Sequence, residues 1–97
     1  MEAESKEFYK MLTDMTFYLI QRQNGVGGNE FKNKLAIIEN SIKVLPEEDN
    51  KLINAFVYEK QPIKNIMAQN NISRNIVYYR LKRIAKIMAK AYSEGKT

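Results

Sequence analysis

The sequence predicts an all-α protein, a single domain of about five helices. Its 97 residues, with 44% hydrophobic and 28% charged side chains, have the ordinary balance of one small globular domain. Apolar residues recur three and four positions apart in several segments, which is the spacing of amphipathic helices. No segment shows the alternation of apolar and polar residues that is typical of a half-buried strand.

The first predicted helix covers about residues 4–23. Apolar residues lie four, three and four positions apart on one face of it: Phe8, Leu12, Met15 and Leu19. Aromatic residues broaden this face: Tyr9, Phe17 and Tyr18. Residues 24–29 then hold three of the four glycines, which predicts a flexible linker or a wide loop.

Two more helices are expected in the middle of the chain. The second covers about residues 29–43, where the same spacing returns: Phe31, Leu35, Ile38 and Ile42. The third begins at Pro46 and extends to about Glu59. Proline suits the first turn of a helix, and carboxylates there suit the positive end of the helix dipole: Glu47, Glu48 and Asp49. Its inward residues are predicted to be Leu52, Ile53, Phe56 and Val57.

The fourth and fifth helices are separated by a predicted turn. The fourth starts at Pro62 and ends near Gln69. Asn70-Asn71 is typical of a turn, because asparagine tolerates the left-handed backbone conformation better than most residues. Ser73 is a suitable N-cap for the last helix, which is expected to run to about Tyr92.

The last predicted helix has two different faces. Apolar residues gather on one side: Val77, Leu81, Ile84, Met88 and Ala91, with Ile76 and Ile87 on one flank. The opposite side is mostly cationic: Asn75, Tyr79, Lys82, Arg83, Lys86 and Lys90. We therefore expect one face to join the core and the other to form a basic surface. A solvated surface without a binding role is the simplest alternative for such a basic face.

The charge of the chain is concentrated in the same helix. The net charge is +5, from 16 basic and 11 acidic residues. Residues 1–45 are neutral overall, whereas residues 74–97 carry seven basic residues against Glu94 alone. Positive charge concentrated on a small domain favours an acidic partner, usually nucleic acid.

A short helix, a tight turn and a basic amphipathic helix form a helix-turn-helix signature. The second helix of such a unit can enter the major groove of duplex DNA, with its N-terminal residues at the base edges. Four residues occupy that end: Arg74, Asn75, Tyr78 and Tyr79. Asparagine can bind adenine, and arginine can bind guanine or phosphate. Tyr78 lies closer to the apolar side, so packing and DNA contact are equally open for it.

Three stretches resemble region 4 of sigma-70-type factors: Leu45-Pro46-Glu47-Glu48, the pair Ile63 and Ile66, and the run from Ile72 to Arg83. Among small proteins, the chain resembles the phage late-transcription regulators of Gram-positive bacteria (the ArpU, RinA and LtrC-like groups). The resemblance covers about residues 44–92. In this chain Asn71 replaces the usual turn glycine, and Asn70 stands at a position that is usually apolar.

The resemblance implies a helix-turn-helix DNA-binding module over residues 44–97, preceded by an N-terminal helical segment over residues 1–43. In that pattern Val77 and Leu81 pack against the short helix. The DNA-binding residues are expected to be Ser73, Arg74, Asn75, Tyr78, Tyr79, Lys82, Arg83, Lys86 and Lys90. The first segment is expected either to complete the core or to serve as a homodimer interface or a docking surface for polymerase.

The implied function is a sequence-specific, DNA-binding transcription regulator. It would be a late-gene activator of a phage or mobile element, acting with host RNA polymerase on double-stranded DNA in the bacterial cytoplasm, at the nucleoid. The alternative is a protein-interaction module that binds RNA polymerase or another regulator without an operator of its own.

Several other classes are not expected. The chain has no Cys and no His, which excludes disulfides, thiolate metal sites and His-based catalytic triads. No apolar run is long enough to span a bilayer, and the polar, acidic start of the sequence differs from a secretory signal. The glycines at 25–28 lack the Lys-Ser/Thr of a phosphate-binding loop. We therefore expect no enzymatic activity, no cofactor, no metal and no membrane partner.

Overall fold

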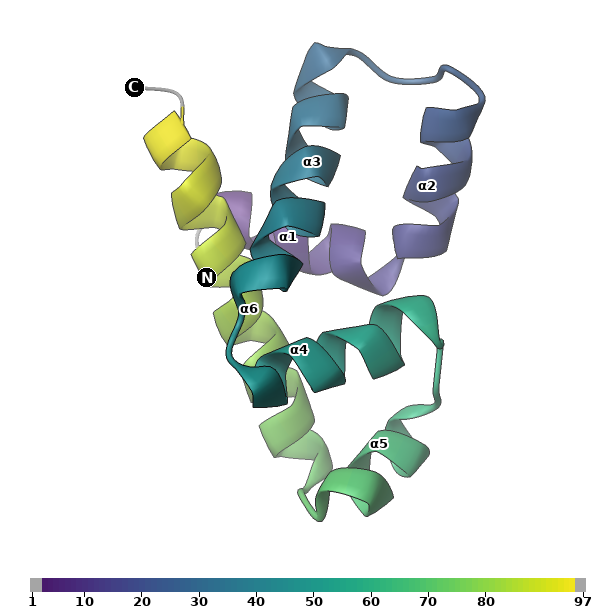
Figure 1. Ribbon diagram of the computed structural model, residues 1–97, viewed down its shortest axis with the longest axis vertical. Helices are drawn as coiled ribbons and strands as arrows, with labels where there is room; N and C mark the ends of the chain where they lie inside the picture. Colours follow the sequence, from purple (N-terminus) through teal and green to yellow (C-terminus); the bar gives the residue numbers. More distant parts are fainter. Residues whose placement is uncertain (1–2, 96–97) are drawn as a thin grey trace.

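The computed structural model describes residues 3–95, and within this range the chain is helical between short connections, with no strand (Figure 1). The helices are α1 (Ala3–Thr13), α2 (Met15–Gln23), α3 (Asn29–Val44), α4 (Glu47–Ile53), α5 (Ile63–Asn70) and α6 (Arg74–Gly95), and a π-helical turn, η1 (Asn54–Tyr58), continues α4. The predicted all-α class is confirmed. The predicted segments 1–43 and 44–97 include residues 1–2 and 96–97, which lie outside the described residues.

The prediction of one helix over residues 4–23 is wrong. The chain leaves the helix at Asp14, where φ is −114° and ψ is 26°, so the described residues form six α-helices rather than five. The hydroxyl of Thr13 donates a hydrogen bond to the carbonyl oxygen of Lys10 at 2.8 Å. Such bonds from a side chain to the preceding turn compete with the regular helix and bend it. As a result α1 and α2 point in different directions (Figure 1).

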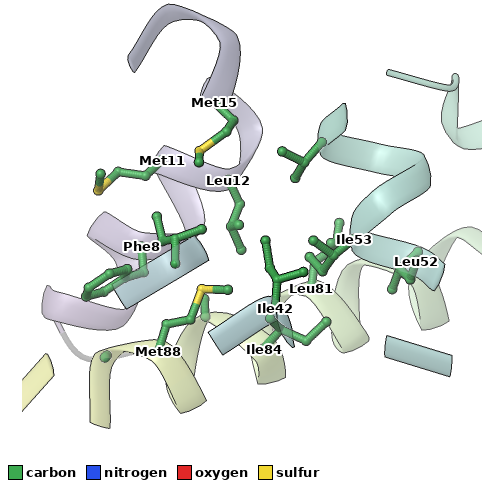
Figure 2. Close-up of a cluster of buried hydrophobic side chains, with 14 of the residues drawn as sticks. Phe8, Met11, Leu12, Met15, Ile42, Leu52, Ile53, Leu81, Ile84 and Met88 are labelled. Carbon is green, nitrogen blue, oxygen red and sulfur yellow. The ribbon is translucent and has the colours of Figure 1, made fainter. Parts of the chain in front are cut away.

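Helix α6 is the central element of the fold, because α1, α3, α4 and α5 all pack against it. Its buried residues are Val77, Leu81, Ile84, Ala85, Met88, Ala89 and Tyr92. Figure 2 shows Phe8 and Leu12 of α1 in one buried cluster with Met88 and Ile84 of α6. The rings of Phe8 and Tyr92 meet edge to face, with 5.8 Å between their centroids. The hydrophobic core is thus continuous from the N-terminal segment into the last helix.

A buried lysine joins three helices at the C-terminal end of α6. Lys34 Nζ lies 2.6 Å from a carboxylate oxygen of Glu7, 3.3 Å from one of Glu30 and 5.1 Å from the centre of the Tyr92 ring. The Tyr92 hydroxyl donates to Glu30 at 3.1 Å. Burial by itself lowers the pKa of Lys34, but hydrogen bonds and charge from both carboxylates outweigh it, so the pKa lies above its usual value. The buried ammonium is therefore kept charged and paired.

The remaining helices lie close to their predicted bounds, but two details of the predicted core differ. Ile76 and Ile87 are exposed, so the prediction that they widen the apolar face of α6 is wrong. Ile87 lines an open hollow beside Pro46, at the start of α4, rather than packing under a helix. Phe56 is only partly buried, whereas Leu52, Ile53 and Val57 are buried as predicted. The spacing of apolar residues gives the direction in which a helix faces the core, but not how much of its circumference the neighbouring helices cover.

Replacing Phe8 with alanine is expected to lower the free energy of unfolding by about 3–5 kcal/mol, because Phe8 is fully buried between α1 and α6. The matched control is Tyr79→Ala, which truncates an exposed aromatic residue. This variant should change the free energy of unfolding by less than about 0.5 kcal/mol. Urea denaturation followed by circular dichroism measures both. Equal effects of the two substitutions would show that α1 does not belong to the core.

Candidate nucleic-acid interface

The connection between α5 and α6 consists of three residues, Asn71, Ile72 and Ser73. Asn71 has left-handed backbone angles, φ 53° and ψ 47°, as the sequence predicts. The N–H of Ile72 donates to the carbonyl oxygen of Met67 at 3.1 Å, and Ile72 packs against the core. This is the hydrogen bond of a Schellman helix end, with asparagine where glycine is commonest. The turn is therefore anchored to the core at its centre.

Helix α6 begins directly after this turn. The N–H of Ile76 donates to the Ser73 side-chain oxygen at 3.3 Å, so the predicted N-cap is confirmed. Val77 and Leu81 are fully buried, in the same core cluster as Ile66 of α5. The cap fixes where α6 starts, and the buried side fixes its rotation. Together they determine which side chains of its first turns face outward.

Five of the predicted site residues form one exposed stripe on α6: Asn75, Tyr79, Lys82, Lys86 and Lys90. They lie four, three, four and four positions apart, on the side of the helix opposite the buried residues. We call this set the α6 stripe. A hollow of about 320 Å³ is lined by Tyr79 and by three cationic residues, Lys82, Arg83 and Lys86. Ser73 and Arg74 are also exposed, at the helix start.

Tyr78 does not belong to this stripe. Its side chain is partly buried and packs against the core. Burial, together with the nearby Tyr78, raises the pKa of Tyr9 in α1. Of the two roles that the sequence leaves open for Tyr78, packing is therefore observed.

Arg83 makes an ion pair that the sequence analysis missed. Its Nη2 atom lies 2.7 Å from Oδ1 of Asp49, whose side chain is only 4% exposed. Arg80 Nη2 lies 3.8 Å from a carboxylate oxygen of Glu48. Arg83 and Asp49 are 34 positions apart, so no local pattern indicates the pair. The sequence interpretation gave Asp49 a helix-dipole role, which its place in the first turn of α4 still permits.

The surface around α6 is therefore divided by charge. The acidic start of α4 lines a second hollow, of about 360 Å³, together with Arg83 and Ile87. On the stripe side, no ion pair joins Arg74, Lys82 or Lys86 to a carboxylate of residues 3–95. These cations are available to an anionic ligand. A polyanion bound to the stripe would be repelled by Glu47 and Glu48 at its edge.

Comparisons with protein-family models, with curated proteins and with solved structures give no significant match. None of the helices in residues 3–95 is both long and apolar enough to cross a membrane. In the same range, no group of acidic side chains is arranged so that it could hold a metal ion.

Substitutions of Asn71 test the left-handed turn. Asn71→Val is expected to lower the free energy of unfolding by about 1–2 kcal/mol, because a β-branched residue is strained at φ 53°. Asn71→Gly should leave it unchanged or raise it slightly. Urea denaturation of the two variants and the parent measures the difference. If valine is tolerated as well as glycine, the turn does not have this conformation.

Removal of the Asp49 carboxylate tests the ion pair with Arg83. Asp49→Ala is expected to lower the free energy of unfolding by about 1–3 kcal/mol, because the charge-assisted hydrogen bond to Arg83 is lost. Glu47→Ala is the control, since Glu47 is an exposed carboxylate of the same turn paired only with exposed Lys51 in residues 3–95. A thermal or urea denaturation series compares the two. Indistinguishable variants would contradict a structural role for the pair.

Proposed function

We propose that the protein is a sequence-specific, DNA-binding transcription regulator that acts with host RNA polymerase, encoded by a phage or another mobile element. The observation that carries this proposal is the α6 stripe. Polar and cationic side chains follow a capped helix start, and the opposite face of the same helix is held in the core. In this proposal α5, the turn and α6 form a helix-turn-helix unit.

The position of each residue along α6 suggests its role. Asn75 and Tyr79 lie in the first turns, where a helix in the major groove presents side chains to base edges. Asn75 can form two hydrogen bonds with an adenine. Arg74 is exposed beside them and suits a guanine or a phosphate. Ser73, at the positive end of the helix dipole, lies where a phosphate would be favoured.

The second half of the stripe suits the DNA backbone. Lys82, Lys86 and Lys90 project from the same side, where phosphate contacts would set the position of the protein without discriminating among sequences. Arg83 can add a further contact while Asp49 limits its freedom. The carboxylates of Glu47 and Glu48 would keep the phosphates away from α4. This arrangement favours one orientation of α6 in the groove.

The alternative function is a protein-interaction module that binds RNA polymerase or another regulator. The hollow at the start of α4 supports this alternative function, because it combines the exposed Ile87 and Pro46 with exposed carboxylates. Such a surface suits a partner with apolar and basic groups. Retention of polymerase on the immobilised protein after nuclease treatment, without any DNA sequence preference, would support this alternative.

A homodimer through the predicted N-terminal helix, residues 4–23, also belongs to the proposal, because two copies would double the length of DNA that is recognised. The described part of α1 is committed to the core through Phe8, Met11 and Leu12. A dimer contact in this segment therefore falls to α2. In cells, the proposed site of action is the bacterial nucleoid.

Selection of binding sites from a random pool of duplexes, at near-physiological salt, tests the proposed function. An enriched motif is expected from the purified protein. A palindromic motif would also indicate two copies, with half-sites about one helical turn apart. Binding that selects no motif and vanishes as salt rises would show only nonspecific affinity, and would exclude a sequence-specific regulator.

Two substitutions on the α6 stripe should have different effects on DNA binding. Asn75→Ala is expected to reduce the discrimination between selected and random duplexes by about 1–3 kcal/mol. Lys86→Ala should weaken binding to every duplex and reduce the slope of log affinity against log salt by about one. Fluorescence anisotropy over a salt series measures both quantities.

The matched control is Lys32→Ala, which removes an exposed lysine from the first turns of α3 and should change neither quantity. The assignment of roles would be wrong if Lys86→Ala altered sequence preference while Asn75→Ala did not.

A further inference from the structure

One side of α2 is left uncovered by the rest of the described chain. Its other side is held to α3 by an ion pair between Arg22 and Glu39 and by the rings of Tyr18 and Phe31, whose centroids are 5.6 Å apart. Phe17, however, is 58% exposed and Ile20 is 51% exposed. Exposed apolar side chains grouped in this way are typical of a binding surface.

These two side chains form one wall of a groove of about 600 Å³ between α2 and η1. Apolar residues also come from the opposite wall, Phe56 and Val57, and from Leu12 of α1. We call this the α2–η1 groove. It shares no lining residue with the hollow on the α6 stripe, and α2 lies across the molecule from α6 in Figure 1, so the groove can stay open while the stripe is occupied.

The groove carries one charge of each sign. Asp14 lies at the junction of α1 and α2, and Lys60 follows η1; both are exposed and both line the groove. Neither is joined to an oppositely charged side chain of residues 3–95. The surface therefore combines apolar side chains with one acidic and one basic group.

We propose that the α2–η1 groove is the interface between two copies of this chain, related by a two-fold axis. In a two-fold interface both copies use the same surface. If one residue contacts a second residue of the other copy, the second also contacts the first, so the surface must be complementary to itself. This groove meets that requirement. It offers projecting apolar residues on α2, an apolar wall on η1, and one acidic and one basic group, so Asp14 of each copy can meet Lys60 of the other.

A second copy is favoured over an unrelated partner for this reason. An unrelated partner does not require the groove to hold matching groups of its own. This groove holds both an acid, Asp14, and a base, Lys60, and it has apolar residues on both α2 and η1. The inference rests on the homodimer of the proposed function and names its surface, and it is separate from DNA binding because self-association does not require a duplex. If both proposals hold, the dimer would carry two α6 stripes and would favour a palindromic site.

The first test is the mass of the protein in solution without DNA, measured by sedimentation equilibrium across the micromolar range. The wild-type chain is expected to change from one to two copies as its concentration rises. Ile20→Asp should stay monomeric over the same range. Its control is Val26→Asp, since Val26 is 50% exposed in the glycine-rich loop and lies outside the groove, so this variant should dimerise like the wild type.

Charge reversal gives the sharper test. Asp14→Lys and Lys60→Asp should each weaken self-association about tenfold, because two like-charged pairs replace two opposite ones. An equimolar mixture of the two variants should recover wild-type affinity, since a mixed dimer restores both opposite pairs. Aspartate suits position 60, where φ is 53°, because it tolerates the left-handed conformation.

Restoration by mixing supports the two-fold interface, and a structural defect in either variant could not produce it. A wild-type chain that stays monomeric across the whole range would overturn the proposal. Dimers that persist in both charge-reversed variants and in Ile20→Asp would overturn it too. None of these outcomes depends on whether the protein binds DNA, so the two proposals can fail separately.

Discussion

Burial of one face of α6 organises the whole fold. Helices α1, α3, α4 and α5 all pack on this one helix, and its inward side chains from Val77 to Tyr92 are almost entirely removed from water. Because a helix is rigid over several turns, fixing one face also fixes the other. The α6 stripe is thus a direct consequence of the core. The rotation of α6 about its own axis decides both which side chains are buried in the core and which are exposed for the proposed DNA contact.

Two buried ionic groups anchor α6 at different points along its length. Asp49 holds Arg83 in the middle of the helix, and Lys34 lies against Tyr92 near its end with carboxylates of α1 and α3 around it. A buried charge is tolerated only when it is paired, so each anchor restricts which helix arrangements are allowed. Removing Arg83 would leave the Asp49 carboxylate buried without its partner, and removing both Glu7 and Glu30 would do the same to the Lys34 ammonium. These contacts add specificity to a core that apolar burial already stabilises.

The residues expected to form one helix, 4–23, form α1 and α2 instead. The break at Asp14 lets α1 pack against α6 while α2 runs beside α3 (Figure 1). A straight helix of this length would extend about 30 Å and could not follow both neighbours. The sequence leaves core completion and partner contact open for this segment, and the structure shows core completion by α1. The described part of α1 completes the core, and α2 keeps an exposed apolar side.

Local patterns in the sequence predict the helical class, most helix bounds, the left-handed Asn71, the Ser73 cap and the two-faced character of α6. Each of these follows from residues a few positions apart, through periodicity, backbone preference or capping. Tertiary packing sets the Asp49–Arg83 pair, the partial burial of Tyr78, the exposure of Ile76 and Ile87, and the α2–η1 groove. These depend on which helices pack together and how much of each surface they cover. Such contacts join residues far apart in the chain, so no local spacing contains them.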